Sequence, residues 1–177
     1  MTSITSTSFG LVIGFLLPGL MGLLSLVFWS ERMRAVFQTF LTAQSSVGLF
    51  LLVILAALTV GLMVTVVRWA LFECWWCKSD RLQTSDFAAL GTSKDKLEAF
   101  SAAVDAHYRY HQFWGGMAVV LPILYVSWLH SAYTIWSFCQ IALTFSFFIA
   151  VEILTAIAAA VAYRIFVGRA RSILTGG

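Results

Sequence analysis

A single carboxylate, Glu152, lies inside a long run of otherwise uncharged residues from Ile135 to Tyr163. A carboxylate at membrane depth is costly unless it is protonated, paired or hydrated. Two roles are open to it. It could lock helices together by pairing with Arg68 or another polar group, or it could serve transport by accepting a proton, binding a cation or lining a pore.

A second set of chemically competent residues is made of two cysteines and two histidines. Cys74 and Cys77 are three residues apart, and His107 and His111 are four apart. Each spacing lets a pair converge on one tetrahedral zinc ion. The competing interpretation is that the cysteines are small interfacial hydrophobes and the histidines amphipathic interface residues. We therefore expect no cofactor, with zinc at these four residues as the alternative.

The composition is that of a membrane protein. The chain has 177 residues, of which 60% are hydrophobic and 11% charged, against about 25% charged residues in soluble domains. The net charge of +3 does not indicate a nucleic-acid partner, because the basic residues flank apolar runs, as topology signals do. No phosphate-binding loop, nucleophile elbow or zinc-protease motif occurs, so we expect no enzyme.

Apolar runs long enough to cross a bilayer predict an all-α integral membrane protein with four transmembrane helices in an antiparallel bundle. Between the first two runs, Glu31 to Ser46 alternate apolar and polar residues at helical spacing. This pattern predicts an amphipathic helix at the membrane surface. The predicted spans of this single transmembrane domain are residues 9–29, 47–72, 113–130 and 135–163.

The segment 73–112 holds many of the charges and predicts a short cytoplasmic helical region. We expect one helix to run from about Lys94 into the third span, loosened at the interface by Gly115 and Gly116. So few residues cannot build a substantial soluble core. This region must therefore pack on other helices or on a partner.

Small residues in the first span recur every four positions, at Gly10, Gly14, Pro18 and Gly22. Such a stripe lets another helix approach closely, so we interpret it as a helix-packing surface. Pro18 should also kink the helix, because it lacks a backbone N–H and its ring crowds the preceding turn.

The distribution of Lys and Arg predicts the orientation of the chain. With four spans, nine of these residues lie on the side of the two termini, and only Arg32 and Arg34 lie on the other side. The positive-inside rule then places both termini in the cytoplasm. The nine are Arg68, Lys78, Arg81, Lys94, Lys96, Arg109, Arg164, Arg169 and Arg171.

By layout, the chain resembles small four-span subunits of the bacterial inner membrane that work beside a larger cytoplasmic protein. The leading hypothesis is a non-enzymatic membrane subunit that forms homo-oligomers, contacts lipid and couples the bilayer to a cytoplasmic partner. The alternative is an oligomeric pore or channel for ions or protons, with Glu152 on the path.

Overall fold

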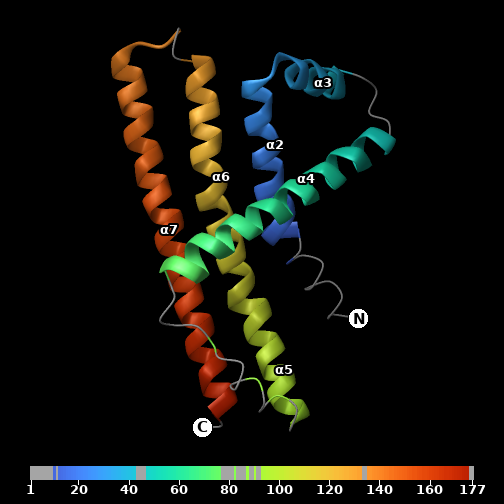
Figure 1. Ribbon diagram of the computed structural model, residues 1–177, viewed down its shortest axis with the longest axis vertical. Helices are drawn as coiled ribbons and strands as arrows, with labels where there is room; N and C mark the ends of the chain where they lie inside the picture. The colour runs from blue at the N-terminus through green and yellow to red at the C-terminus, as the bar shows by residue number, and fades with distance from the viewer. Residues whose placement is uncertain are drawn as a thin grey trace.

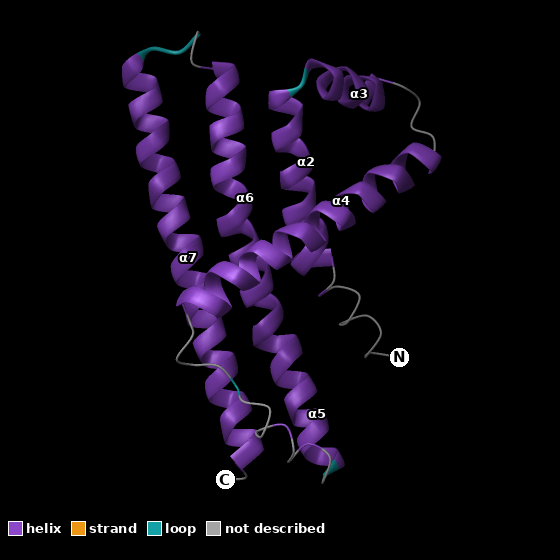
Figure 2. Ribbon diagram, in the orientation of Figure 1, coloured by secondary structure: helices purple, strands orange, loops and turns teal. Residues whose placement is uncertain are grey.

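The chain is helical in the part that the computed structural model describes, and no strand occurs there (Figures 1 and 2). That part comprises Gly10 and residues 12–42, 47–76, 82, 87, 90, 93–132 and 135–175. Three of the described helices are long and apolar enough to cross a membrane: Val47–Cys74, Lys94–Ala132 and Phe138–Leu174. The prediction of an all-α protein built on helices of membrane-spanning length is confirmed.

In the predicted span 9–29, the structure describes Gly10 and residues 12–29, and all of them are helical. A π-helical turn, η1 (Val12–Leu16), leads into α2 (Leu17–Trp29). The apolar helical part, Gly14–Trp29, is about 24 Å long at about 1.5 Å per residue. Pro18 lies at the start of α2, where a missing N–H costs little. The helix changes from π to α geometry just before Pro18, and the kink expected at this proline stays a prediction.

The next two helices differ sharply in character. The predicted amphipathic segment forms α3 (Glu31–Thr42), which lies across the end of α2 (Figure 1). It is followed by α4 (Val47–Arg68), which continues into the π-helix η2 (Trp69–Trp76). Figure 1 shows that α4 crosses α2 and α6 obliquely instead of running along them.

The last two long helices lie side by side and run in opposite directions (Figure 1). One continuous helix comprises α5 (Lys94–Ala103), η5 (Val104–Tyr108) and α6 (Arg109–Ala132), and it begins at the predicted residue. The other is α7 (Phe138–Thr175), with 38 residues. The expected loosening at Gly115 and Gly116 is wrong, because both lie buried within unbroken α6 and the irregular turn is η5.

Two glycines explain why α4 crosses α2 at this angle. A Cβ atom on Gly19 of α2 would clash with the backbone carbonyl of Ala57, and one on Gly61 of α4 would clash with that of Phe15. The two backbones are therefore in direct contact, which only residues without side chains permit. Because both glycines are buried, this contact fixes how α4 leaves the other helices.

The buried apolar residues form three clusters along the long axis. One lies where α4 meets α6 and contains Val64, Val119 and Val120. The second joins Phe72 to Ala118 and Ala159. The third lies between α7 and the α5–η5 region, with Tyr163, Phe166, Val167 and Ala170 at its centre and Phe100 and Val104 against it.

Candidate functional site

Among the described residues, the charged side chain buried most deeply is that of Arg68, at the end of α4. It is 1% exposed, and its Nη1 lies 2.8 Å from Oε1 of Glu73. The two residues are five positions apart in the sequence. They can meet because the helix changes from α to π geometry directly after Arg68. Hydrogen bonding from i to i+5 in a π-helix brings the fifth residue under the first. The π-helix thus builds this ion pair.

Two residues from the next helix complete a polar cluster around Glu73. The Tyr108 hydroxyl donates a hydrogen bond of 3.1 Å to Oε1 of Glu73, and Nε2 of His111 lies 3.6 Å from the same oxygen. His111 is fully buried. Its Nδ1 is 2.8 Å from the carbonyl oxygen of Ala159 on α7. Since a carbonyl can only accept, Nδ1 carries a proton there.

Close packing holds the polar cluster of Arg68, Glu73, Tyr108 and His111 in place. A Cβ on Gly115 would lie 2.8 Å from Cγ of Arg68, so this glycine of α6 makes room for the arginine stem. The guanidinium carbon is 5.9 Å from the centre of the Tyr108 ring, within cation–π range. The ring of Phe72 meets that of His111 edge-on, with centres 6.2 Å apart.

The cluster can act as a lock between helices. Arg68 and Glu73 balance each other's charge, so the group is neutral overall when His111 is neutral. It joins the end of α4 to η5 and α6 through Glu73, and α6 to α7 through His111. Removing one charge from such a group leaves the other buried without compensation, which is strongly destabilising.

Glu152 lies apart from this cluster. Its side chain is half-buried on the face of α7 that also carries the buried residues Thr155 and Ala159. One carboxylate oxygen, Oε2, is buried and has no hydrogen-bond partner among the described residues. The hydroxyl of Thr155 donates instead to the backbone carbonyl of Glu152. The expected pairing of Glu152 with Arg68 is wrong, because Arg68 is held by Glu73.

Three of the four zinc candidates, Cys74, His107 and His111, lie among the described residues. His111 faces Ala159 and Glu73, and the buried Nε2 of His107 has no hydrogen-bond partner in the described part of the chain. Cys74 is half-buried, while Cys77 lies outside the described residues. Within the residues that are described, no three His, Cys, Asp or Glu side chains form a metal-binding group. Zinc binding stays a prediction.

The stripe of small residues in the first helix lies mainly along α6. Gly10 lies against the side chain of Arg109, Gly14 against that of Gln112, and Pro18 against Gly116. The fourth member, Gly22, instead lies against Val60 of α4.

Two members of the polar cluster could not be recognised from the sequence. Glu73 reads as the first polar residue after a span, and Tyr108 as part of an apolar helix stripe. The signal that could have found Glu73 is its separation of five from Arg68, but side chains on an α-helix meet at three and four. Arg68 is buried and does not extend to the membrane interface, as basic residues at the end of an apolar run often do.

The fold and the cluster together define an all-α protein with helices long and apolar enough to cross a membrane, which are linked through a buried polar cluster. Comparison with models of protein families, with curated proteins and with solved structures gives no match to this chain.

Proposed function

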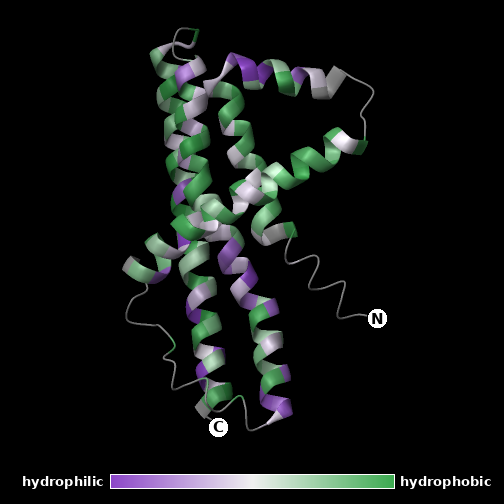
Figure 3. Ribbon diagram, turned by 45° about the vertical axis from the view of Figure 1, so that its right-hand side comes forward, coloured by the Kyte–Doolittle hydropathy of each residue, from purple (hydrophilic) through white to green (hydrophobic). Residues whose placement is uncertain are grey.

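We propose that this protein is a small, self-associating subunit of the inner membrane that couples the bilayer to a cytoplasmic protein. The observation that carries the proposal is a helical stalk, made of α5, η5 and the end of α7 from Tyr163. The helix Lys94–Ala132 has 39 residues and is about 58 Å long, well beyond a hydrocarbon core of about 30 Å. Figure 3 shows hydrophilic residues along this end of both helices.

The stalk is a packed unit that continues directly into the membrane helices. Tyr163, Phe166 and Val167 form its core with Phe100 and Val104. The exposed side of α7 in the stalk is basic, through Arg164, Arg169 and Arg171. This charge suits a partner with an acidic surface.

The polar cluster lies where the stalk meets the membrane helices, which supports the coupling role. Tyr108 belongs to the stalk, whereas Arg68 ends a helix of membrane-spanning length. Both contact Glu73. A displacement of the stalk by a partner would therefore act on α4 through a buried ion pair instead of through loosely packed side chains.

Basic residues are in excess around the stalk. This excess favours a cytoplasmic location for the stalk and for both termini. The amphipathic helix α3 would then lie on the outer surface of the membrane, where residues 31–36 are exposed on the isolated chain.

The surface proposed for self-association is the first half of α4. Its large apolar residues are exposed, including Phe50 at 54% and Leu52 at 62%, and burial within α4 begins at Ala57. The backbone contact at Gly19 and Gly61 holds this half away from α2, so it cannot fold back along its own helices. A second copy of the chain is the occupant proposed for this surface.

Photo-crosslinking in intact cells tests both contacts with one chemistry. A photoreactive residue at Leu97, 52% exposed on the stalk, should give an adduct with one other protein. The same residue at Leu52 should give an adduct of twice the monomer mass. The matched control is Ile153, 54% exposed on α7, which should give neither. Absence of a protein adduct from Leu97 contradicts the coupling role, and absence of a dimer from Leu52 contradicts the proposed interface.

A second candidate function is favoured by the unpartnered carboxylate oxygen of Glu152. A half-buried acid whose inner oxygen has no partner among the described residues is suited to carry a proton or to line an ion path. Reconstituted liposomes discriminate this from the coupling role. Proton or ion flux by the wild type that disappears in Glu152→Gln would establish conduction, whereas a wild type without flux removes the support for it.

A further inference from the structure

Pro122 lies inside α6, which packs along α7. A proline has no backbone N–H, so Pro122 cannot donate the hydrogen bond that the carbonyl of Ala118, four residues earlier, receives in a regular α-helix. Ala118 is buried, and at membrane depth no bulk water supplies the missing donor. Side chains of neighbouring helices satisfy such freed carbonyls in membrane proteins. A polar side chain that faces this point of α6 is therefore the natural source of the donor.

Ring contacts at two levels fix the register between α6 and α7. The ring of Tyr125 stacks on that of Phe148, with centres 4.4 Å apart. Fourteen residues earlier on α6 and fifteen residues later on α7, the rings of His111 and Tyr163 lie 4.9 Å apart. Because the two helices are antiparallel, equal steps from the first contact toward the second lead to residues at the same level.

Glu152 and Pro122 lie at the same level between these two contacts. Pro122 is three residues from Tyr125, and Glu152 is four residues from Phe148. Each is thus one helical turn further along and on the same face as the residue that makes the ring contact. The register therefore brings Glu152 to the point of α6 where a donor is missing.

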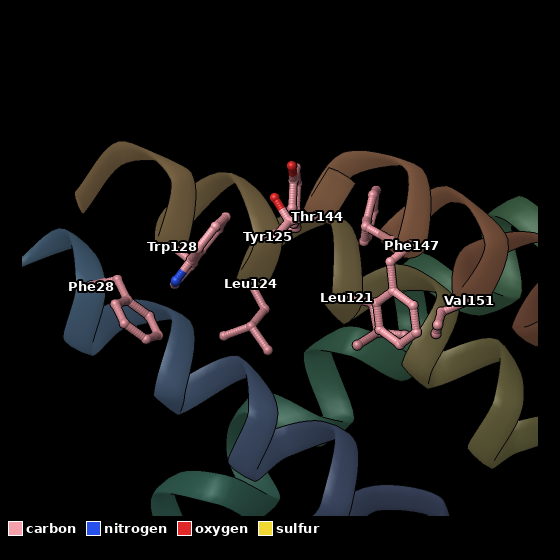
Figure 4. Close-up of a pocket in the computed structure, with 9 residues that line it drawn as sticks. Phe28, Leu121, Leu124, Tyr125, Trp128, Thr144, Phe147 and Val151 are labelled. Atoms are coloured by element: carbon pink, nitrogen blue, oxygen red, sulfur yellow. The ribbon is translucent and has the colours of Figure 1, made fainter. Parts of the chain in front are cut away.

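An apolar groove beside this point gives the same register. It is lined by Leu121 from α6 and by Val151 from α7, among other residues (Figure 4). Leu121 directly precedes Pro122, and Val151 directly precedes Glu152. In each helix, the residue after the groove residue belongs to the face that meets the other helix.

Glu152 has a free position for a hydrogen bond. Its buried oxygen, Oε2, has no hydrogen-bond partner among the described residues. None of the ion pairs of the described residues involves Glu152. An ionised carboxylate and a backbone carbonyl can only accept hydrogen bonds, whereas a protonated carboxyl group has an O–H that donates. One proton on Glu152 therefore satisfies both the carboxyl group and the freed carbonyl.

The charged and titratable groups around this part of α7 supply no counter-charge for an ionised Glu152. On α6, Tyr125 lies one turn away, and His111 donates from Nδ1 to a backbone carbonyl of α7 at 2.8 Å. Arg68 and Glu73, where α4 meets η2, pair with each other at 2.8 Å. The segment Leu17–Trp29 of α2 has no charged residue, and the charges of α5 and η5 lie in the stalk.

We propose that Glu152 is a proton-binding site, whose carboxyl O–H donates a hydrogen bond to the backbone carbonyl of Ala118 that Pro122 leaves free. Uptake of a proton from water forms the O–H bond and joins α7 to α6. Release of the proton to water breaks both bonds and leaves two acceptors facing each other. The inference builds on the second candidate function, because it names the proton as the species that Glu152 holds and the backbone group that holds it there.

Infrared spectroscopy of the purified protein in detergent measures this proton directly. A protonated carboxyl group has a carbonyl stretching band that a carboxylate lacks, and exposed carboxyl groups are ionised at neutral pH. The wild type should show the band at neutral pH, and Glu152→Gln should lose it. The matched control is Glu98→Gln, at a side chain 71% exposed, which should retain it. A wild type without the band overturns the proposal, and so does a band that appears only when Na⁺ and K⁺ are removed, since a metal cation then occupies the site.

A double-mutant cycle tests the acceptor. Pro122→Ala restores an N–H for the carbonyl of Ala118, and Glu152→Met removes the proposed donor at similar size. One buried group left without a partner should make Glu152→Met lower Tm by about 2–12 °C more in the wild type than in the Pro122→Ala variant. The control Ile153→Met, at a side chain 54% exposed on α7, should have the same effect in both.

Pro122→Ala should also shift the infrared band of Glu152, because the new N–H competes for the carbonyl of Ala118. Equal effects of Glu152→Met in the two backgrounds, or a band that Pro122→Ala leaves unchanged, overturn the bond between the two helices. These measurements follow protonation and stability, not flux. A protein that holds the proton but conducts nothing in liposomes would therefore refute conduction and leave the proton site established.

Discussion

Glu73→Gln is the substitution with the largest expected effect on stability. It removes the charge of Glu73 but keeps its size and one acceptor oxygen, so Arg68 stays buried at 1% exposure without a counter-charge. Breaking a buried ion pair from one side costs about 3–5 kcal/mol. For a chain of this length, roughly 2–4 °C of melting temperature is lost per kcal/mol, so the expected decrease in Tm is about 6–20 °C.

The double variant Arg68→Met/Glu73→Gln separates charge burial from loss of packing. Replacing both partners of a buried pair by uncharged groups is often neutral or stabilising. We therefore expect the double variant to melt well above the single variant, close to the wild type. Thermal unfolding in a mild detergent, followed by intrinsic fluorescence and by loss of the monodisperse elution peak, measures both.

Glu98→Gln is the matched control, because it makes the same chemical change in an exposed ion pair. Nζ of Lys94 lies 3.9 Å from Oε1 of Glu98, and the two side chains are 87% and 71% exposed. Such pairs contribute roughly 0–1 kcal/mol, so Tm should change by about 4 °C at most. If Glu73→Gln melts within that margin of the wild type, or if the double variant is less stable than the single one, the buried lock does not exist.

Three further outcomes follow from the same geometry. Gly61→Ala should destabilise the fold by about 1–3 kcal/mol, as overpacking does. The control Gly168→Ala, with nothing within 4 Å of the added Cβ, should leave Tm unchanged or raised. Equal Tm values for the two variants would contradict the backbone contact at the helix crossing. Glu152→Gln should fold and elute as the wild type does, because Glu73, not Glu152, holds Arg68; aggregation of this variant would show a buried cation partner. Leu97→Cys in a cysteine-free background should react with a membrane-impermeant maleimide only after the cells are opened, and labelling of intact cells would reverse the proposed orientation.

The helical class and the long helices could be predicted from the sequence because they depend on local properties. Runs of apolar residues set the length of a helix that can cross a bilayer. The helix that begins at Lys94 and continues through α6 follows from an apolar stripe with no break in it. In the first run the described residues are helical as predicted, but the sequence did not predict the π-helical geometry of η1 (Val12–Leu16).

The polar cluster could not be predicted because it depends on an exception to helical periodicity. In an α-helix, side chains meet when they are three or four residues apart. Arg68 and Glu73 are five apart, so they would point in different directions. The π-helix that aligns them begins at Trp69, and nothing in the local sequence marks it. The other members come from distant parts of the chain. Tyr108 lies 35 positions after Glu73, and Ala159 of α7, which is hydrogen-bonded to His111 of α6, lies 91 positions after Arg68.

The small-residue stripe shows the same limit in packing. Gly10, Gly14 and Gly22 recur at the period that defines one face of a helix, yet Gly19, one position outside the stripe, makes the close backbone contact with α4. A period in the sequence tells which residues share a face, but not which face a neighbour takes. That choice is made jointly with Gly61 on the other helix, and it sets the direction of α4. The exposure of the first half of α4, and with it the surface proposed for a second copy, is therefore a consequence of two glycines 42 positions apart.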